Sequence, residues 1–106
     1  MEKQESERFE AKTVQVLRGH INEIGSMEKA VVAATTARTG VPNLTDIFKE
    51  LSTAAYEISS TMQYYGGGTT PADVTNLMQQ TLLRISGCTS ALARYPSLIA
   101  YKRSRH

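Results

Sequence analysis

The sequence predicts an all-α fold, a small antiparallel bundle of three to four helices with a basic C-terminal tail. Apolar residues recur at intervals of three and four along most of the 106 residues, which is the spacing of one helix face. Segments rich in glycine and proline divide the chain where helices would end. No segment alternates polar and apolar residues for long enough to predict a strand. The hydrophobic content of 41% suffices for one core, so we expect a single domain over residues 1–106.

The first helical segment is expected after a charged opening, residues 1–6, that we expect to be frayed. Gly25 interrupts its apolar stripe, and Ser26 is a favourable N-cap followed by an acid, Glu28, in the next turn. We therefore expect a kink or a short break at this point, and a true break would make four helices rather than three. The stripe consists of Phe9, Thr13, Val16, Leu17, Ile21, Ile24, Met27 and Val31.

The next boundary is predicted near Arg38. Gly40 can take the left-handed conformation that ends a helix, and Pro42 cannot continue one. Asn43 or Thr45 is expected to cap the second long helix. Its inward positions are predicted to be Leu44, Ile47, Phe48, Leu51, Ala55, Ile58, Met62 and Tyr65.

Three glycines, residues 66–68, are expected to end that helix because they carry high backbone entropy and no side chain to pack. Thr70, Pro71 and Asp73 then match the N-cap, first and third positions of a helix start that closes a capping box. The last long helix is expected to end at Tyr95-Pro96. Its predicted inward residues are Val74, Leu77, Met78, Leu82, Ile85, Cys88 and Leu92.

Charge is unevenly divided along the chain. The formal net charge is +2, but residues 1–73 hold ten acids and seven bases, whereas residues 74–106 hold five bases and no acid. The basic residues of that last part are Arg84, Arg94, Lys102, Arg103 and Arg105. Residues 97–106 are apolar and then basic, and we expect either a basic tail or a short helix that docks on the bundle or on a neighbour.

The composition also indicates the compartment. A single cysteine cannot form an internal disulfide, which is compatible with a reducing, cytoplasmic setting. No apolar run approaches the roughly 20 residues that span a bilayer, and the N-terminus has no apolar signal region. We expect no membrane association.

The inventory of reactive side chains argues against catalysis. Cys88, His20 and His106 form no metal-binding motif, so we expect neither a metal nor a cofactor. Cys88 lies at an inward position and is expected to be a buried thiol, and His20, close to the apolar stripe, a structural or half-exposed histidine. No nucleophile or acid-pair motif is present. The chain is therefore not expected to be an enzyme.

The glycine run precedes a helix start, where backbone N–H groups could face a phosphate. The lysine and the preceding strand of a nucleotide-binding loop are both missing, which favours a linker between helices. Of the adjacent pair Tyr64-Tyr65, we expect Tyr65 to be core and Tyr64 to be free to stack on an unpaired base.

The last long helix carries the strongest binding signal. Gln80, Arg84, Gly87, Ala91 and Arg94 follow one another at helical spacing and share one face. Two arginines beside small residues can grip a phosphate backbone, with Lys102, Arg103 and Arg105 extending the positive field. Alternatively, the small residues admit another helix and the arginines are solvated, or the arginines meet the acidic N-terminal helix of another copy or partner.

With these basic residues, its small size and its helical content, the chain resembles the small helical subunits of CRISPR interference complexes. The resemblance implies a non-catalytic subunit of a nucleoprotein assembly that holds a nucleic-acid backbone through Arg84, Arg94, Lys102, Arg103 and Arg105, with Tyr64 beside a base. Its partners would be other protein subunits or further copies of itself, and nucleic acid. Two alternatives remain: a self-assembling coat-like subunit, and an adaptor that binds only protein.

Overall fold

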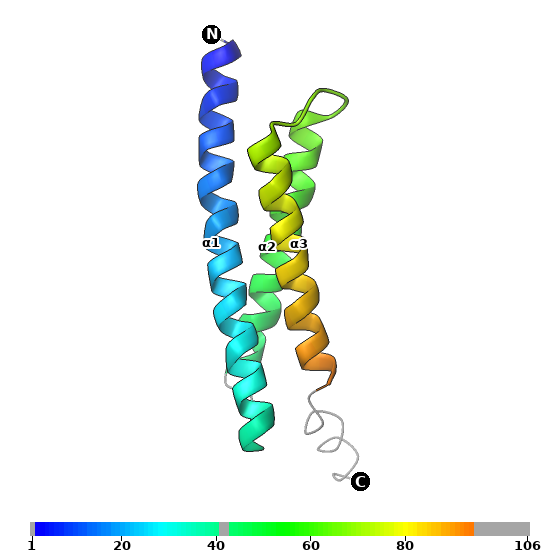
Figure 1. The fold of residues 1–106 in the computed structure, drawn as a ribbon. Helices are drawn as coiled ribbons and strands as arrows, with labels where there is room; N and C mark the ends of the chain where they lie inside the picture. Colours follow the sequence, from blue (N-terminus) through cyan, green and yellow to red (C-terminus); the bar gives the residue numbers. More distant parts are fainter. Residues whose placement is uncertain (1, 41–42, 95–106) are drawn as a thin grey trace.

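Three helices pack side by side in the computed structural model, which describes residues 2–40 and 43–94 (Figure 1). They are α1 (Glu2–Ala37), α2 (Leu44–Tyr65) and α3 (Ala72–Ala93). Consecutive helices are antiparallel, so α1 and α3 run in the same direction. The described residues contain no strand, and the all-α prediction is confirmed. Residues 95–106, which include the predicted tail, lie outside the described part of the chain.

The first helix is longer and more regular than the sequence suggested. α1 is continuous for 36 residues from Glu2, so the break expected at Gly25 does not occur, and the frayed opening stays a prediction. A glycine within a helix costs up to about 1 kcal/mol. Ile24 and Val31, which flank Gly25, are fully buried against the other helices, and their burial outweighs that cost.

The helix ends also depart from the predicted caps. Arg38, with φ of 56°, takes the left-handed position that was assigned to Gly40, and the N–H of Thr39 donates to the carbonyl of Ala34 at 3.0 Å. Asn43 does occupy the N-cap of α2, but its side chain makes no capping hydrogen bond.

The capping box predicted before α3 does not form. Pro71, rather than Thr70, is the N-cap residue, and no side-chain cap is made. The Asp73 carboxylate instead accepts a hydrogen bond of 2.8 Å from the N–H of Val74. The glycine run does end α2 as expected, since Gly66 has φ of 53° and donates to the carbonyl of Met62.

The core lies along the contact lines of α1 with the other two helices. One cluster occupies the end of the bundle where α1 finishes, and a smaller one lies toward the end where α1 begins. The first consists of Ile24, Val31, Ile47, Leu51, Ala54, Cys88, Ala91 and Leu92. The second consists of Leu17, Ile58 and Leu77.

The buried rows of α2 and α3 differ by one position from the prediction at several points. Ala54, Thr61 and Thr81 are buried, and the hydroxyls of both threonines donate to the backbone carbonyl four residues earlier. Small side chains therefore lie at the centre of the bundle, where they let the helices approach closely. The larger residues predicted to be inward are exposed: Phe48 by 53%, Met62 by 60% and Leu82 by 51%, and Ala55 is exposed as well.

Because α1 is continuous, replacing Gly25 with alanine should stabilise the protein. A Cβ added to Gly25 meets no atom within 4 Å, and alanine lowers the backbone entropy that folding must remove. We expect Gly25→Ala to raise the free energy of unfolding by about 0.5–1 kcal/mol in urea titrations. Gly19→Ala, which is equally unobstructed in the same helix, should act similarly. A loss of stability in Gly25→Ala alone would contradict a continuous α1.

Candidate functional site

The face of α3 that was predicted to hold a phosphate backbone packs against α1. Ala91 is 4% exposed within the larger core cluster. Gly87 lies against Glu28 of α1, where an added Cβ would come within 2.8 Å of the Glu28 carboxylate oxygen Oε1. The small residues therefore admit α1 of the same chain, in line with the alternative interpretation of this face, and a contact of Arg84 and Arg94 with a phosphate backbone stays a prediction.

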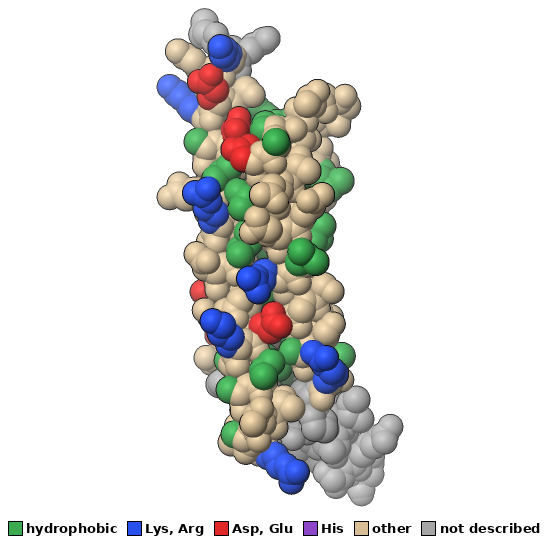
Figure 2. Space-filling model, viewed as in Figure 1, with side chains coloured by type: hydrophobic (Ala, Val, Ile, Leu, Met, Phe, Trp, Pro, Cys, Tyr) green, Lys and Arg blue, Asp and Glu red, His purple; other side chains and the backbone are tan. Residues whose placement is uncertain are grey.

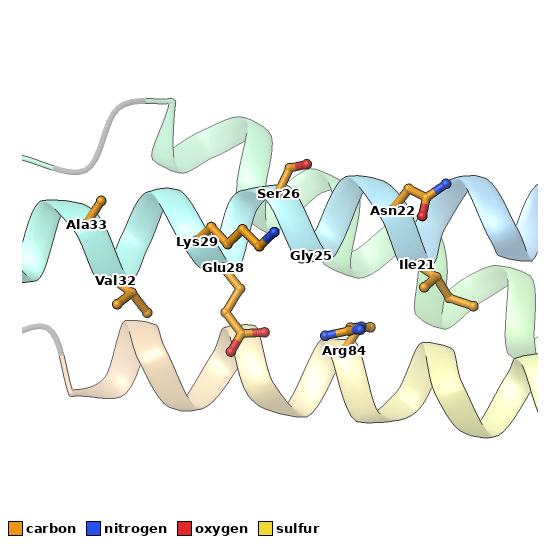
Figure 3. A pocket seen from close by; sticks show the side chains of 9 residues that line it. All are labelled: Ile21, Asn22, Gly25, Ser26, Glu28, Lys29, Val32, Ala33 and Arg84. Carbon is orange, nitrogen blue, oxygen red and sulfur yellow. The ribbon is translucent and has the colours of Figure 1, made fainter.

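The two described arginines of the predicted site have different surroundings. Arg84 lines a groove between α1 and α3, where its guanidinium and the Glu28 carboxylate extend toward each other and Lys29 lies nearby (Figure 3). An acid in the groove reduces the attraction that Arg84 offers to a phosphate. Arg94, at the C-cap of α3, is exposed. Lys102, Arg103 and Arg105 fall outside the described residues, so their predicted role is not tested.

Tyr64 is not free. Its ring stacks on Phe9 of α1 with centroids 3.5 Å apart and an interplanar angle of 12°. Tyr65 meets both rings edge-on, at 5.6 Å from Phe9 and 5.1 Å from Tyr64. The three rings join the first part of α1 to the end of α2, an arrangement that stabilises the pair of helices. Tyr64 remains 49% exposed, and its contact with a base stays a prediction.

Beside these rings two acids from different helices meet. A hydrogen bond shared with Asp73 raises the pKa of Glu10, and desolvation and the charges of Asp73 and Glu7 raise it further. The hydroxyl oxygen of Tyr65 is buried without a hydrogen-bond partner among the described residues, and burial, followed by the charge of Glu10, raises its pKa. The two acids and the three rings therefore lie close together at this end of the bundle.

His20 and Cys88 have structural surroundings, as the sequence indicated. The Nδ1 atom of His20 lies 2.5 Å from Oε2 of Glu50, which ties α1 to α2 in a largely buried pair. Cys88 is fully buried, and desolvation raises the pKa of its thiol, so it is a poor nucleophile. In the part of the chain that the structure describes, no three histidine, cysteine or acidic side chains gather as a metal site requires.

The largest feature that the sequence did not single out is an uncharged surface on α2 and α3. Glu50 and Tyr64 mark the side of α2 that faces α1, and Gly87 and Ala91 mark that side of α3. The opposite sides of the two helices form what we call the outer face. On α2 it comprises Phe48, Ser52, Ala55, Ser59 and Met62, and on α3 Thr75, Gln79, Leu82, Ser86 and Thr89.

The outer face combines apolar exposure with a complete lack of charge. Phe48, Met62 and Leu82 are each at least half exposed on it, and Tyr56 and Leu83 beside it are 73% and 71% exposed. α2 and α3 carry four and two charged residues, against eleven on α1. In Figure 2 the charged side chains accordingly gather mainly along α1 and at the ends of the molecule. Large apolar side chains that are exposed on an uncharged face can mark an interaction site.

Comparisons of the chain with protein-family models, with curated proteins and with solved structures find no match. The resemblance to CRISPR subunits therefore stays a prediction. Of the helices that the structure describes, none has the length and apolar character needed to cross a membrane.

The Glu10–Asp73 contact gives the protein a specific pH dependence. The folded-state pKa of Glu10 lies above the ordinary value of 4.5, so the folded protein binds this proton more readily than the unfolded chain does. The ionised pair is unfavourable at pH 7, and the penalty disappears as the pH falls through the folded-state pKa toward 4.5. We expect Glu10→Gln to be more stable than the wild type in urea at pH 7.

At pH 4 the two proteins should have nearly equal unfolding midpoints, because the wild-type carboxyl is then largely protonated in both states. Glu23→Gln makes the same change at an exposed position of α1 and serves as the control. If Glu10→Gln exceeds the wild type in free energy of unfolding by as much at pH 4 as at pH 7, the ionisation of Glu10 is not the cause of the difference.

Proposed function

We propose that the protein is a non-catalytic structural subunit that joins a larger assembly through the outer face of α2 and α3. The observation that carries the proposal is the exposure of Phe48, Met62 and Leu82 on one face of α2 and α3 that has no charged residue. Burying such side chains is favourable by about 25 cal/mol per Å² of apolar area. A CRISPR interference complex, as implied by the resemblance above, is one assembly of this kind.

The other surfaces support this role less well. The groove beside Arg84 is lined by charges of both signs, Glu28 and Lys29 included. The small-residue face of α3 is filled by α1, and the exposed ring of Tyr64 is stacked on Phe9. The outer face presents exposed large apolar side chains on two neighbouring helices, and helical subunits often meet through such faces.

A single charge placed on the outer face should remove the protein from its assembly. We expect the tagged wild-type chain, in a native extract of its source, to elute in gel filtration as a species larger than the monomer. Leu82→Arg should shift it to the monomer position, because the interface would have to bury an unpaired charge. Ala11→Arg adds the same charge at an exposed position of α1 and should leave elution unchanged.

Far-UV circular dichroism would show that each variant remains helical, so that lost assembly is not lost folding. Wild-type protein that elutes at monomer size, or Leu82→Arg protein that still elutes with the large species, would overturn the proposal.

A second candidate function, contact with a nucleic-acid backbone, is favoured by one observation. Arg38 and Arg94 follow the C-terminal ends of α1 and α3, which lie at the same end of the bundle (Figure 1). This end is opposite the acidic Glu10–Asp73 contact. The predicted basic residues Lys102, Arg103 and Arg105 follow Arg94 in the sequence, so a polyanion would be attracted to this end.

Fluorescence anisotropy with single- and double-stranded DNA and RNA tests this candidate. We expect binding that weakens steeply with salt, and Arg94→Glu should weaken it for all sequences alike and reduce the salt slope by about one. Arg18→Glu makes the same change on α1 and should have little effect. The candidate fails if the wild type binds none of the four nucleic acids at low salt.

A further inference from the structure

We propose that the outer face binds a second copy of this chain in an antiparallel orientation, about a two-fold axis that passes Ala55 and Leu82. This inference rests on the proposed function and names the first partner at its surface. The product would be a bundle in which α2 lies against α2 of the other copy and α3 against its α3. Every helix of that four-helix core would be antiparallel to both of its neighbours, as in most bundles.

The two proposed axis positions lie at the same height on adjacent helices. α2 and α3 each have 22 residues, and the chain reverses between them. Ala55 lies ten residues before the end of α2, and Leu82 lies ten residues after the start of α3. Because both helices rise about 1.5 Å per residue, Ala55 and Leu82 are level and both lie at the middle of their helices. A single two-fold axis perpendicular to the helices can therefore pass beside both Ala55 and Leu82.

The residues on either side of this axis are arranged symmetrically by size. Phe48 and Met62 each lie seven residues from Ala55, so an antiparallel copy places Phe48 beside Met62 of its partner and Ala55 beside the same alanine. The two large side chains are the most exposed apolar groups of the outer face, and small Ser52 and Ser59 stand between them and Ala55. On α2 the large residues thus lie at the ends and the small ones at the centre, whereas on α3 the central residue is Leu82, which would pack against Leu82 of the other copy.

Charge favours a copy of the chain over an unrelated partner. In an isologous interface each residue near the axis faces itself or a close neighbour, so a charged side chain there would meet its own charge. Neither α2 nor α3, both fully described, places a charge on this face. Its serine, threonine and glutamine side chains both donate and accept hydrogen bonds and can pair with their own kind.

The area is adequate for a stable pair. Each helix is about 33 Å long from its rise per residue, and two helices side by side are roughly 20 Å wide. The flat area of the outer face is then about 650 Å² per copy, without the surface that protruding side chains add. Specific interfaces bury about 800 Å² per partner. The protruding side chains of Phe48, Met62 and Leu82 add contact area to the flat area of the face.

Cysteine cross-linking tests the axis directly. We expect the purified full-length chain to be a dimer in sedimentation equilibrium and Ala55→Cys to form a disulfide-linked dimer under mild oxidation. Phe48→Cys alone should not, because two antiparallel copies hold this position about 21 Å apart. Phe48→Cys combined with Met62→Cys should cross-link again. Cys88 is buried, so we expect it to form no cross-link in any of the variants.

Two further variants control for chance collision and for folding. Ala11→Cys, exposed on α1, should stay unlinked, and Leu82→Arg should be a helical monomer by sedimentation and circular dichroism. A purified wild type that stays monomeric at every concentration would overturn the inference. So would Phe48→Cys that cross-links as readily as Ala55→Cys, which indicates parallel or unspecific pairing. If the monomer nevertheless enters a large species in the native extract, only this inference fails and the proposed function stands.

Discussion

The contact between α1 and α3 is the constraint on which the rest of the molecule depends. Gly87 and Ala91 let α1 lie close to α3, and Val31 and Ile24 of α1 fill the core from the other side. α1 thus covers the small residues of that side of α3 and leaves Arg84 beside a groove between the two helices. The same contact fixes the rotation of α3, and this rotation turns Leu82 outward to solvent. One close helix contact therefore covers part of one candidate surface and creates another.

Periodicity was enough to predict the helices but not the row that each of them buries. The three-and-four spacing of α2 is satisfied almost equally by Ala55 and Met62 or by Ala54 and Thr61, which lie one position away. Hydrophobicity favours the first pair, whereas the bundle buries the second. A threonine that bonds its own backbone carries no unsatisfied hydroxyl into the core. In the core the small size of the threonine side chain matters more than its polarity. The space available to a side chain depends on the neighbouring helix, which the spacing along one helix does not give.

The candidate site shows the same limit more strongly. The sequence places Arg84, Gly87 and Arg94 on one face, and they do share a face, but the element that covers it is α1, about 60 positions earlier in the chain. Tyr64 likewise meets Phe9 from the far end of the sequence. Spacing along one helix contains no information about such partners. His20 and Cys88 were predicted more accurately because their inward position alone restricts what they can do.

The number of charged residues differs between the helices, and this difference bears on the structure more than the difference in net charge between the two parts of the sequence. α1 carries eleven charged residues, of which eight have side chains that the structure describes as exposed, a usual means of keeping an exposed helix in water. α2 and α3 have outward surfaces of similar extent and carry six between them. A face that is apolar at Phe48, Met62 and Leu82 and has no charge to oppose self-contact is poorly suited to remaining in water. Its composition is instead that of a surface covered by another helical protein.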